Sequence, residues 1–202
     1  MNLVKRIVAL LAFMIMVIIP TMIIFAEPED LMTASPAYPV QCIEMADMDE
    51  EMKETLIRSV ITEKEETKLV QMLYGEERTH SFRERAAVIW HTFNRVDSPL
   101  EANSVNKDIT HSHYSGYLTS NPKKDWAIWI VRDVTWRYAC EQLGYEDVGR
   151  VLPPDYLYMA MHKGHNRFRT KYRGGSYYDW NIPSLAIYHD MEEQFLGKRW
   201  DD

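Results

Sequence analysis

An acidic pair, Glu76 and Glu77, follows Tyr74-Gly75 where the apolar pattern predicts the end of a helix. A carboxyl group at a helix C-terminus meets the negative end of the helix dipole, and a neighbouring acid adds like-charge repulsion. Both effects favour the neutral carboxylic acid, the form that protonates a glycosidic oxygen near neutral pH. Glu76 is therefore a candidate acid catalyst, although most acidic pairs after helices are solvated surface features.

Side chains suited to binding a sugar are concentrated after residue 110. Aromatic faces stack on sugar rings, and side-chain amides both donate and accept hydrogen bonds. The candidates are Tyr114, Tyr117, Asn166, Phe168, Tyr177, Tyr178 and Trp180. Because Tyr and Trp serve equally well in a hydrophobic core, each of these aromatic residues has a structural interpretation beside the ligand-binding one.

Two histidine pairs, His111 with His113 and His162 with His165, offer a different chemistry. With an Asp or Glu they supply the ligands of a catalytic zinc site, as in a metal-dependent amidase or peptidase. Their spacing matches no helical ligand motif. We therefore expect no cofactor and no metal, and we keep the zinc enzyme as the lesser alternative.

Four helices are predicted to position these groups, from capping boxes, a proline at a first helical position and apolar periodicity. Their expected limits are Asp49 to Val60, Thr62 to Gly75, Ser81 to the region of Val96 to Pro99, and Asn121 to Gly144. Ile130, Val134 and Tyr138 are predicted to face inward in the last of these. After Gly144 the chain reads as loops with one or two short strands or helical turns. The expected fold class is α+β, mainly α, with a loop-rich C-terminal part.

The N-terminus predicts export. Lys5 and Arg6 precede the apolar run Ile7–Ala26, so the positive-inside rule places everything after residue 26 outside the cytoplasm. Residues 1–26 are a signal peptide or a membrane anchor helix, because the run is long enough to span a bilayer but contains Pro20. The protein is thus expected to be secreted or membrane-anchored.

The remaining chain divides into an acidic spacer with a short helix, residues 27–61, and one domain, residues 62–202. Between Glu27 and Glu66 twelve acidic side chains face only three basic ones, and the whole chain carries a net charge of −7. This charge and the export signal exclude nucleic acid as an expected partner. The two cysteines, Cys42 and Cys140, form one disulfide or remain free thiols.

Several segments, in this order, resemble the spore cortex-lytic enzyme and cell wall hydrolase family (SleB-type). They are Tyr74-Gly75-Glu76-Glu77-Arg78, Ala86-Ala87-Val88-Ile89, Asn94-Arg95-Val96, Tyr114-Ser115-Gly116-Tyr117 and Gly164-His165-Asn166-Arg167-Phe168. The similarity covers about Thr62 to Trp180. Glu77, Thr79 and His80 depart from the family pattern, whose second Glu is absent.

The resemblance implies a lysozyme-like catalytic domain that cleaves peptidoglycan glycan strands. Glu76 matches the family's catalytic glutamate, and Asn94 and Arg95 are expected to support the wall of the site. The residues expected to bind substrate are Tyr114, Tyr117, His165, Asn166 and Phe168. One catalytic acid favours a lytic transglycosylase, which acts on the bond between N-acetylmuramic acid and N-acetylglucosamine, over a hydrolase.

Two further interpretations stay open at this point. A cluster of five cations without an acid, between Lys163 and Arg173, suits the carboxylates of peptide stems or anionic wall polymers, or is merely a solvated loop. The altered residues after Glu76 are also compatible with a module that binds the wall or a partner without cleaving anything.

Overall fold

The computed structural model describes residues 45–76, 81–99, 103–162, 165–180 and 185–197. Within these ranges the protein is mainly helical with one small antiparallel sheet, which confirms the α+β, mainly α class. The predicted signal or anchor segment, residues 1–26, lies outside the described residues, as does Cys42. Cys140 is a buried free thiol, and burial raises its pKa to about 11.

The described elements follow one another along the chain. They are the 3-10 turn η1 (Met45–Asp47) and the helices α2 (Glu50–Val60), α3 (Glu63–Glu76), α4 (Phe82–Asp97), α5 (Val105–Asp108) and α6 (Asp125–Gln142), then the strands β1 (Tyr158–His162) and β2 (His165–Arg169), and the helix α7 (Ala186–Leu196). No helix in the described ranges is both long and apolar enough to cross a membrane.

Side-chain caps begin three of these helices where the sequence predicted them. Asp49 accepts the Met52 N–H at 2.8 Å before α2. At α3 the capping box is complete, because Thr62 Oγ1 accepts the Glu65 N–H and the Glu65 carboxylate accepts the Thr62 N–H. Ser81 Oγ accepts the Glu84 N–H at 3.2 Å at the start of α4.

The predicted start of α6 is wrong. The helix begins at Asp125 after Lys124, which makes no side-chain cap, and not at Asn121 with Pro122 in its first turn. The Asn121 side chain instead donates to the carbonyl oxygens of Gln71 and Gly116. At the other end the prediction is confirmed, since Gly144 follows the helix with φ +97, a left-handed conformation that glycine adopts readily.

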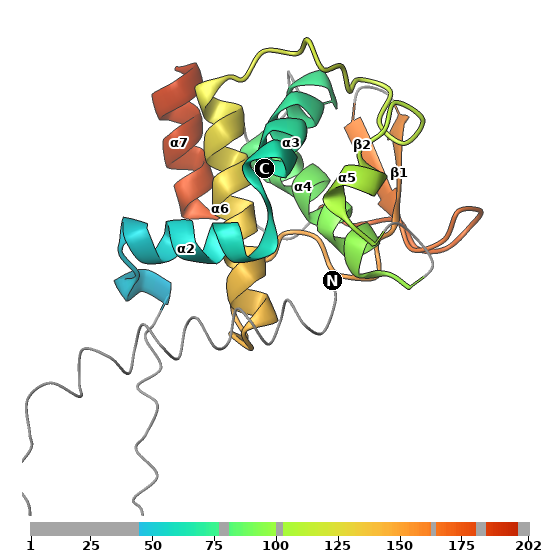
Figure 1. Cartoon of the computed structure of the whole chain (residues 1–202). Coiled ribbons are helices and arrows are strands. Elements are labelled where there is room, and N and C mark those ends of the chain that lie inside the picture. Colours follow the sequence, from blue (N-terminus) through green and yellow to red (C-terminus); the bar gives the residue numbers. More distant parts are fainter. Residues whose placement is uncertain (1–44, 77–80, 100–102, 163–164, 181–184, 198–202) are drawn as a thin grey trace, which may run out of the picture.

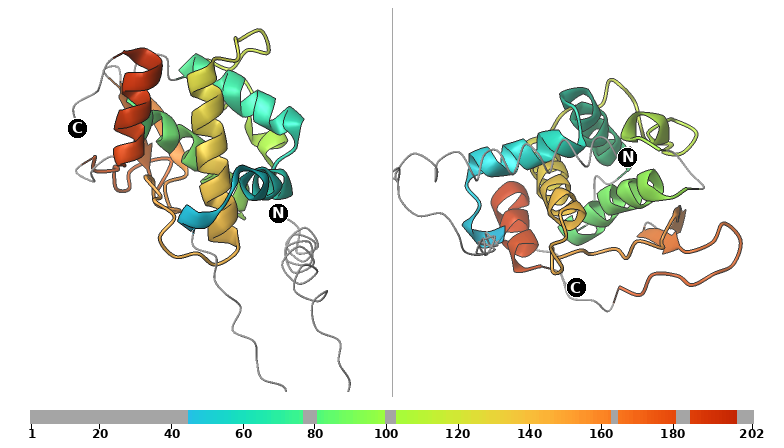
Figure 2. Two further views of the ribbon diagram at one scale, coloured as in Figure 1. Left: turned by 90° about the vertical axis from the view of Figure 1, so that its left-hand side faces the viewer. Right: turned by 60° about the horizontal axis from the view of Figure 1, so that its bottom comes forward.

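Helix α6 is the centre of the molecule. Figures 1 and 2 show α2, α3, α4 and α7 arranged around it, and each of these four packs on it. Ile130, Val134 and Tyr138 face inward as predicted, and the Tyr138 ring stacks on Phe93 with centroids 4.1 Å apart. The hairpin β1–β2 lies on the side of the molecule opposite α7 (Figure 1).

Helix α2 belongs to this core although its sequence suggested a helix within a spacer. Met48, Leu56, Ile57 and Ile61 are all buried in the same cluster as the residues of α3, α4 and α6. At about 1.5–3 kcal/mol for each fully buried large apolar side chain, their burial is a substantial part of a typical folding free energy. Helix α2 is therefore packed into the same core as the helices of the domain predicted from Thr62 onward.

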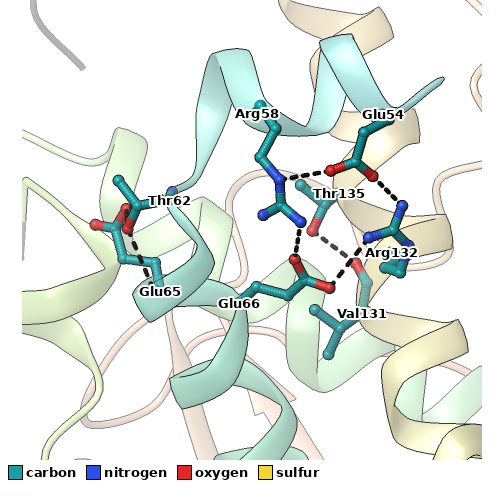
Figure 3. Close-up of polar contacts among 8 residues, drawn as sticks. All are labelled: Glu54, Arg58, Thr62, Glu65, Glu66, Val131, Arg132 and Thr135. Carbon is teal, nitrogen blue, oxygen red and sulfur yellow. Dashed lines mark hydrogen bonds and ion pairs between the residues drawn. The ribbon is translucent and has the colours of Figure 1, made fainter. Parts of the chain in front are cut away.

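An ionic network, formed by Glu54, Arg58, Glu66 and Arg132, joins α2 to α3 and α6 (Figure 3). Arg58 contacts Glu54 at 2.6 Å and Glu66 at 2.5 Å, and Arg132 reaches the same two carboxylates. A hydrogen bond from Arg132 is the main reason that the pKa of Glu54 lies below its usual value, since it outweighs the opposing effect of burial. The network fixes the orientation of α2 over the two helices.

The C-terminal part contains the short strands that the sequence predicted and one helix that it did not. β1 and β2 pair antiparallel, with Met159 opposite Phe168. Helix α7 follows and ends at Gly197, whose φ of +62 makes a left-handed cap. Its buried face includes Glu192, which accepts the Phe82 N–H at the start of α4 and so ties the two helices together.

Candidate active site

Glu76 is the last residue of α3, and its side chain is half-buried. Its Oε1 accepts the backbone N–H of Gly116 at 2.6 Å. Within the described residues Oε2 has no hydrogen-bond partner. One oxygen is thus held by a backbone donor that cannot rotate away, while the other is left for proton exchange with a ligand.

A close contact between two glycines makes this hydrogen bond possible. A Cβ placed on Gly75 would lie 1.8 Å from the Gly116 carbonyl oxygen, and one on Gly116 would lie 2.4 Å from that of Gly75. Neither position has room for a side chain unless the backbone shifts. Two segments about 40 residues apart, both part of the family resemblance, are therefore in direct backbone contact beside Glu76.

Two side-chain amides, those of Asn121 and Gln71, hold the Gly75–Gly116 contact in place. Asn121 donates to the Gln71 carbonyl oxygen at 3.0 Å and to that of Gly116 at 2.8 Å. Gln71, on α3, in turn donates to the carbonyl oxygen of Thr119 at 2.5 Å. The last turn of α3 and the loop 115–121 are thus joined from both sides, which fixes the place of Glu76.

Tyr114 lies in the core, and its predicted contact with substrate is not available in this structure. It is 1% exposed, and its hydroxyl donates to Asp108 Oδ2 at 3.0 Å. The same hydroxyl lies 2.9 Å from Thr92 Oγ1 and 3.1 Å from His91 Nδ1, both on α4. Tyr114 therefore anchors the loop that carries Gly116 to α4.

Burial governs the protonation of this network. Desolvation, aided by the nearby Arg95 charge, lowers the pKa of His91 to about 3, so its imidazole is neutral at any ordinary pH. Desolvation and the Asp108 carboxylate raise the pKa of Tyr114 well above its usual value, so the hydroxyl keeps its proton and donates it to Asp108. His91 and Tyr114 are thus both uncharged over the neutral pH range.

The other predicted substrate-binding residues are divided between core and surface. Phe168 is fully buried and packs on His91 and Trp180, so it offers no face to a ligand. Tyr117 is half-buried and packs on the core from the loop that holds Gly116. His165 is the most accessible of them, with 70% of its side chain exposed.

Asn94 and Arg95 both hold the segment 153–157. The Asn94 amide donates to the carbonyl oxygens of Pro153 at 2.7 Å and Tyr156 at 3.2 Å. Arg95 pairs with the buried Asp108 at 2.7 Å and donates to the Leu157 carbonyl oxygen at 3.1 Å. These contacts join α4 to the segment that leads into the hairpin.

Glu84 is a buried acid in the first turn of α4, and it contacts the start of β2. Its Oε1 accepts the Asn166 N–H at 2.6 Å, and its Oε2 lies 3.3 Å from His165 Nδ1. The Asn166 side chain is 1% exposed, and neither of its polar atoms has a partner in the described structure. The sequence could not predict the contact between Glu84 and His165, because the two residues lie 81 positions apart along the chain.

The described histidines do not assemble into a metal site. Among the residues that the structure describes, no group of three or more His, Cys, Asp or Glu side chains is placed to hold a metal ion. His113 Nδ1 lies 2.8 Å from the Asp108 carbonyl oxygen, and His165 Nδ1 lies 3.3 Å from Glu84 Oε2. The side chain of His162, another histidine of the zinc alternative, lies outside the described residues, so that alternative stays a prediction.

No protein-family model, curated protein or solved structure matches the chain. The resemblance to cell wall hydrolases therefore stays a prediction from the motifs.

Proposed function

We propose that this protein is an exported peptidoglycan-cleaving glycosidase, a lytic transglycosylase with a lysozyme-like domain, and that Glu76 is its catalytic acid. The observation that carries the proposal is the Glu76 carboxylate, with Oε1 held by the Gly116 N–H and Oε2 without a partner in the described residues. A carboxyl group oriented in this way can transfer a proton at one defined position.

The proposed reaction needs one carboxyl group and no water. Glu76 donates its proton to the glycosidic oxygen as the bond from C1 of the muramoyl residue to that oxygen breaks. The 6-hydroxyl of the same muramoyl residue then attacks C1, and its proton returns to Glu76. The products are a free 4-hydroxyl on the neighbouring sugar and a 1,6-anhydromuramoyl end, so the atoms balance without a co-reactant.

The contacts around Glu76 support this assignment because they restrain the carboxylate from two directions. The Gly75–Gly116 contact fixes the backbone on either side of the hydrogen bond. Tyr114, two residues before Gly116, fixes the loop to α5 through Asp108 and to α4 through Thr92. Holding a reacting group in one geometry is a large part of enzymatic rate enhancement.

The test is digestion of purified peptidoglycan by the full chain and by two variants. Glu76→Gln keeps the shape of the side chain but has no acidic proton, so we expect at least a 100-fold loss in rate, in line with the roughly 10²–10⁴ that general acids contribute. Glu63→Gln, at the exposed opposite end of α3, should digest the wall at the normal rate.

The outcomes separate the alternatives. Full digestion by a correctly folded Glu76→Gln variant would remove Glu76 from the mechanism. Binding of the parent chain to the wall without any release of muropeptides would indicate a non-catalytic wall-binding module. Cut stem peptides with intact glycan, in a reaction that a chelator stops, would point to the zinc-dependent amidase.

A further inference from the structure

The hairpin presents a basic outer face. Along β2 the side chains alternate, so that Asn166 and Phe168 point into the protein while Arg167 is exposed and Arg169 half-exposed. On β1, Ala160 lies opposite Arg167, and its short side chain leaves the arginine uncovered. Alternate residues of a strand are about 7 Å apart, so two guanidinium groups stand side by side on this face.

An exposed tyrosine orders both arginines. Tyr177 pairs with Arg169 in an isolated bridge, which places it beside β2 like a residue of a third strand. Its ring centroid is 5.6 Å from the Arg167 guanidinium and 5.8 Å from that of Arg169, and the residue is 54% exposed. A guanidinium held against an aromatic ring keeps its N–H groups available for bidentate bonds to an anion.

No acid neutralises this face within the described structure. Arg167, Arg169, Lys171 and Arg173 form no ion pair with any described residue, whereas Arg58, Arg95, Arg132 and Arg137 each pair with a carboxylate elsewhere. The sequence from residue 163 to residue 178 also contains no Asp or Glu, in a chain with a net charge of −7. The uncompensated charge makes this face attractive to an anionic ligand.

We propose that this face, made of Arg167, Arg169 and Tyr177, binds the free carboxylates of the peptide stems of peptidoglycan. The inference rests on the proposed function, since the stems are attached to the glycan strand that Glu76 would cut and arrive with it. A stem carries more than one free carboxylate, so two arginines on one face can each pair with a group of the same stem. The guanidinium group of an arginine binds a carboxylate through two parallel hydrogen bonds.

The experiment measures binding rather than cleavage. The full chain carrying Glu76→Gln is titrated against peptidoglycan freed of phosphate polymers with hydrofluoric acid, and against the same material with its stem carboxylates amidated. We expect amidation to weaken binding by about tenfold or more, as the loss of one to two charge-assisted contacts would give. Free stem tetrapeptide should compete, and its amide should not.

Variants of the same parent locate the contact. Arg167→Gln with Arg169→Gln should weaken binding to the unmodified stems about as much as amidation does, and should bind amidated wall no worse than the parent. Lys64→Gln with Lys107→Gln removes two exposed cations from α3 and α5, and it should bind like the parent. Circular dichroism checks the fold of each variant, and peptide competition against the parent tests the inference without any hairpin variant.

Binding that ignores amidation, or a folded arginine double variant that binds like its parent, would overturn the inference. Binding that disappears once phosphate polymers are removed would also overturn it, and would name those polymers as the ligand. Cleavage by the unsubstituted chain is measured separately. Its absence alongside carboxylate-dependent binding would count against the proposed function alone, whereas normal cleavage with carboxylate-independent binding would count against this inference alone.

Discussion

At the scale of single residues, two glycines control how Glu76 is held. Gly75 immediately precedes it, and Gly116 donates the hydrogen bond to its carboxylate. Each glycine occupies the space that a side chain on the other would need. The close approach of two backbones is therefore as much a part of the proposed site as the acid itself.

Gly75→Ala is expected to separate α3 from the loop 115–121. The rate of peptidoglycan digestion should fall strongly while the protein stays folded. The added Cβ would lie 1.8 Å from the Gly116 oxygen and 2.7 Å from Asn121 Nδ2, so the hydrogen bond to Glu76 must lengthen or break. Ser115→Ala, a change at an exposed position in the same loop, is the control and should retain full activity. Normal digestion by folded Gly75→Ala would show that the Gly116 contact is dispensable.

Asn94 holds the segment 153–157 against α4. It is 2% exposed and bonds to two carbonyl oxygens and to Arg150 Nη2. Asn94→Leu should lower the free energy of unfolding by about 1–3 kcal/mol, because those groups lose a partner in the interior. Chemical denaturation measures the change, with Asn103→Leu at an exposed position as the control. An unaltered unfolding midpoint would mean that the segment 153–157 does not depend on Asn94.

At the scale of elements, the sequence predicted a helix start correctly where the capping side chain bonds to the first turn of its own helix. Asp49, Thr62 and Ser81 act within three residues of themselves, so their role follows from spacing alone. Asn121 has the same sequence signature, but its amide is used by α3 and Gly116. A tertiary partner took the place of the local one, and spacing could not reveal it.

Helix α7 was missed for a related reason. Its start has no side-chain cap, and its buried face contains His189 and Glu192 between apolar residues. Glu192 is buried because it accepts the Phe82 N–H of α4, a contact 110 residues away along the chain. Tyr114 and Phe168 illustrate the same limit at the candidate site, since sequence cannot distinguish an aromatic residue of the core from one that faces a ligand.

The ionic network between α2, α3 and α6 predicts how stability depends on pH. The pKa of Glu54 is lowered from 4.5 in the folded protein, chiefly by Arg132. A lowered folded pKa contributes stability that is present above the unfolded value and is lost as the pH falls through the folded one. Glu54→Gln should therefore melt at a lower temperature than the parent at pH about 7, and the difference should shrink towards pH about 3.

Thermal melts at a series of pH values test this at low salt, where ion pairs near the surface are least screened. Glu50→Gln is the matched control, because Glu50 lies on the same helix in an exposed pair with Lys53. It should melt almost like the parent at every pH, since exposed pairs contribute little. A difference between parent and Glu54→Gln that stays constant with pH would contradict the role of the network.

At the scale of the whole molecule, the proposed catalytic acid and the basic hairpin face lie on different elements that α4 connects. α4 holds Tyr114 and so the loop around Gly116, and through Glu84 it also holds the start of β2. Because both contacts come from the same helix, the loop and the hairpin are fixed to one common support.

The most direct measurement is mass spectrometry of the glycan ends released from purified peptidoglycan. If Glu76 alone transfers the proton, the tethered 6-hydroxyl is favoured over water as the nucleophile because of its effective concentration. We expect 1,6-anhydromuramoyl ends, lighter than hydrolysed ends by one water and resistant to borohydride, and we expect Glu76→Gln to release none. Reducible muramic acid ends, or anhydro ends formed equally well by folded Glu76→Gln, would show that the proposed mechanism is wrong.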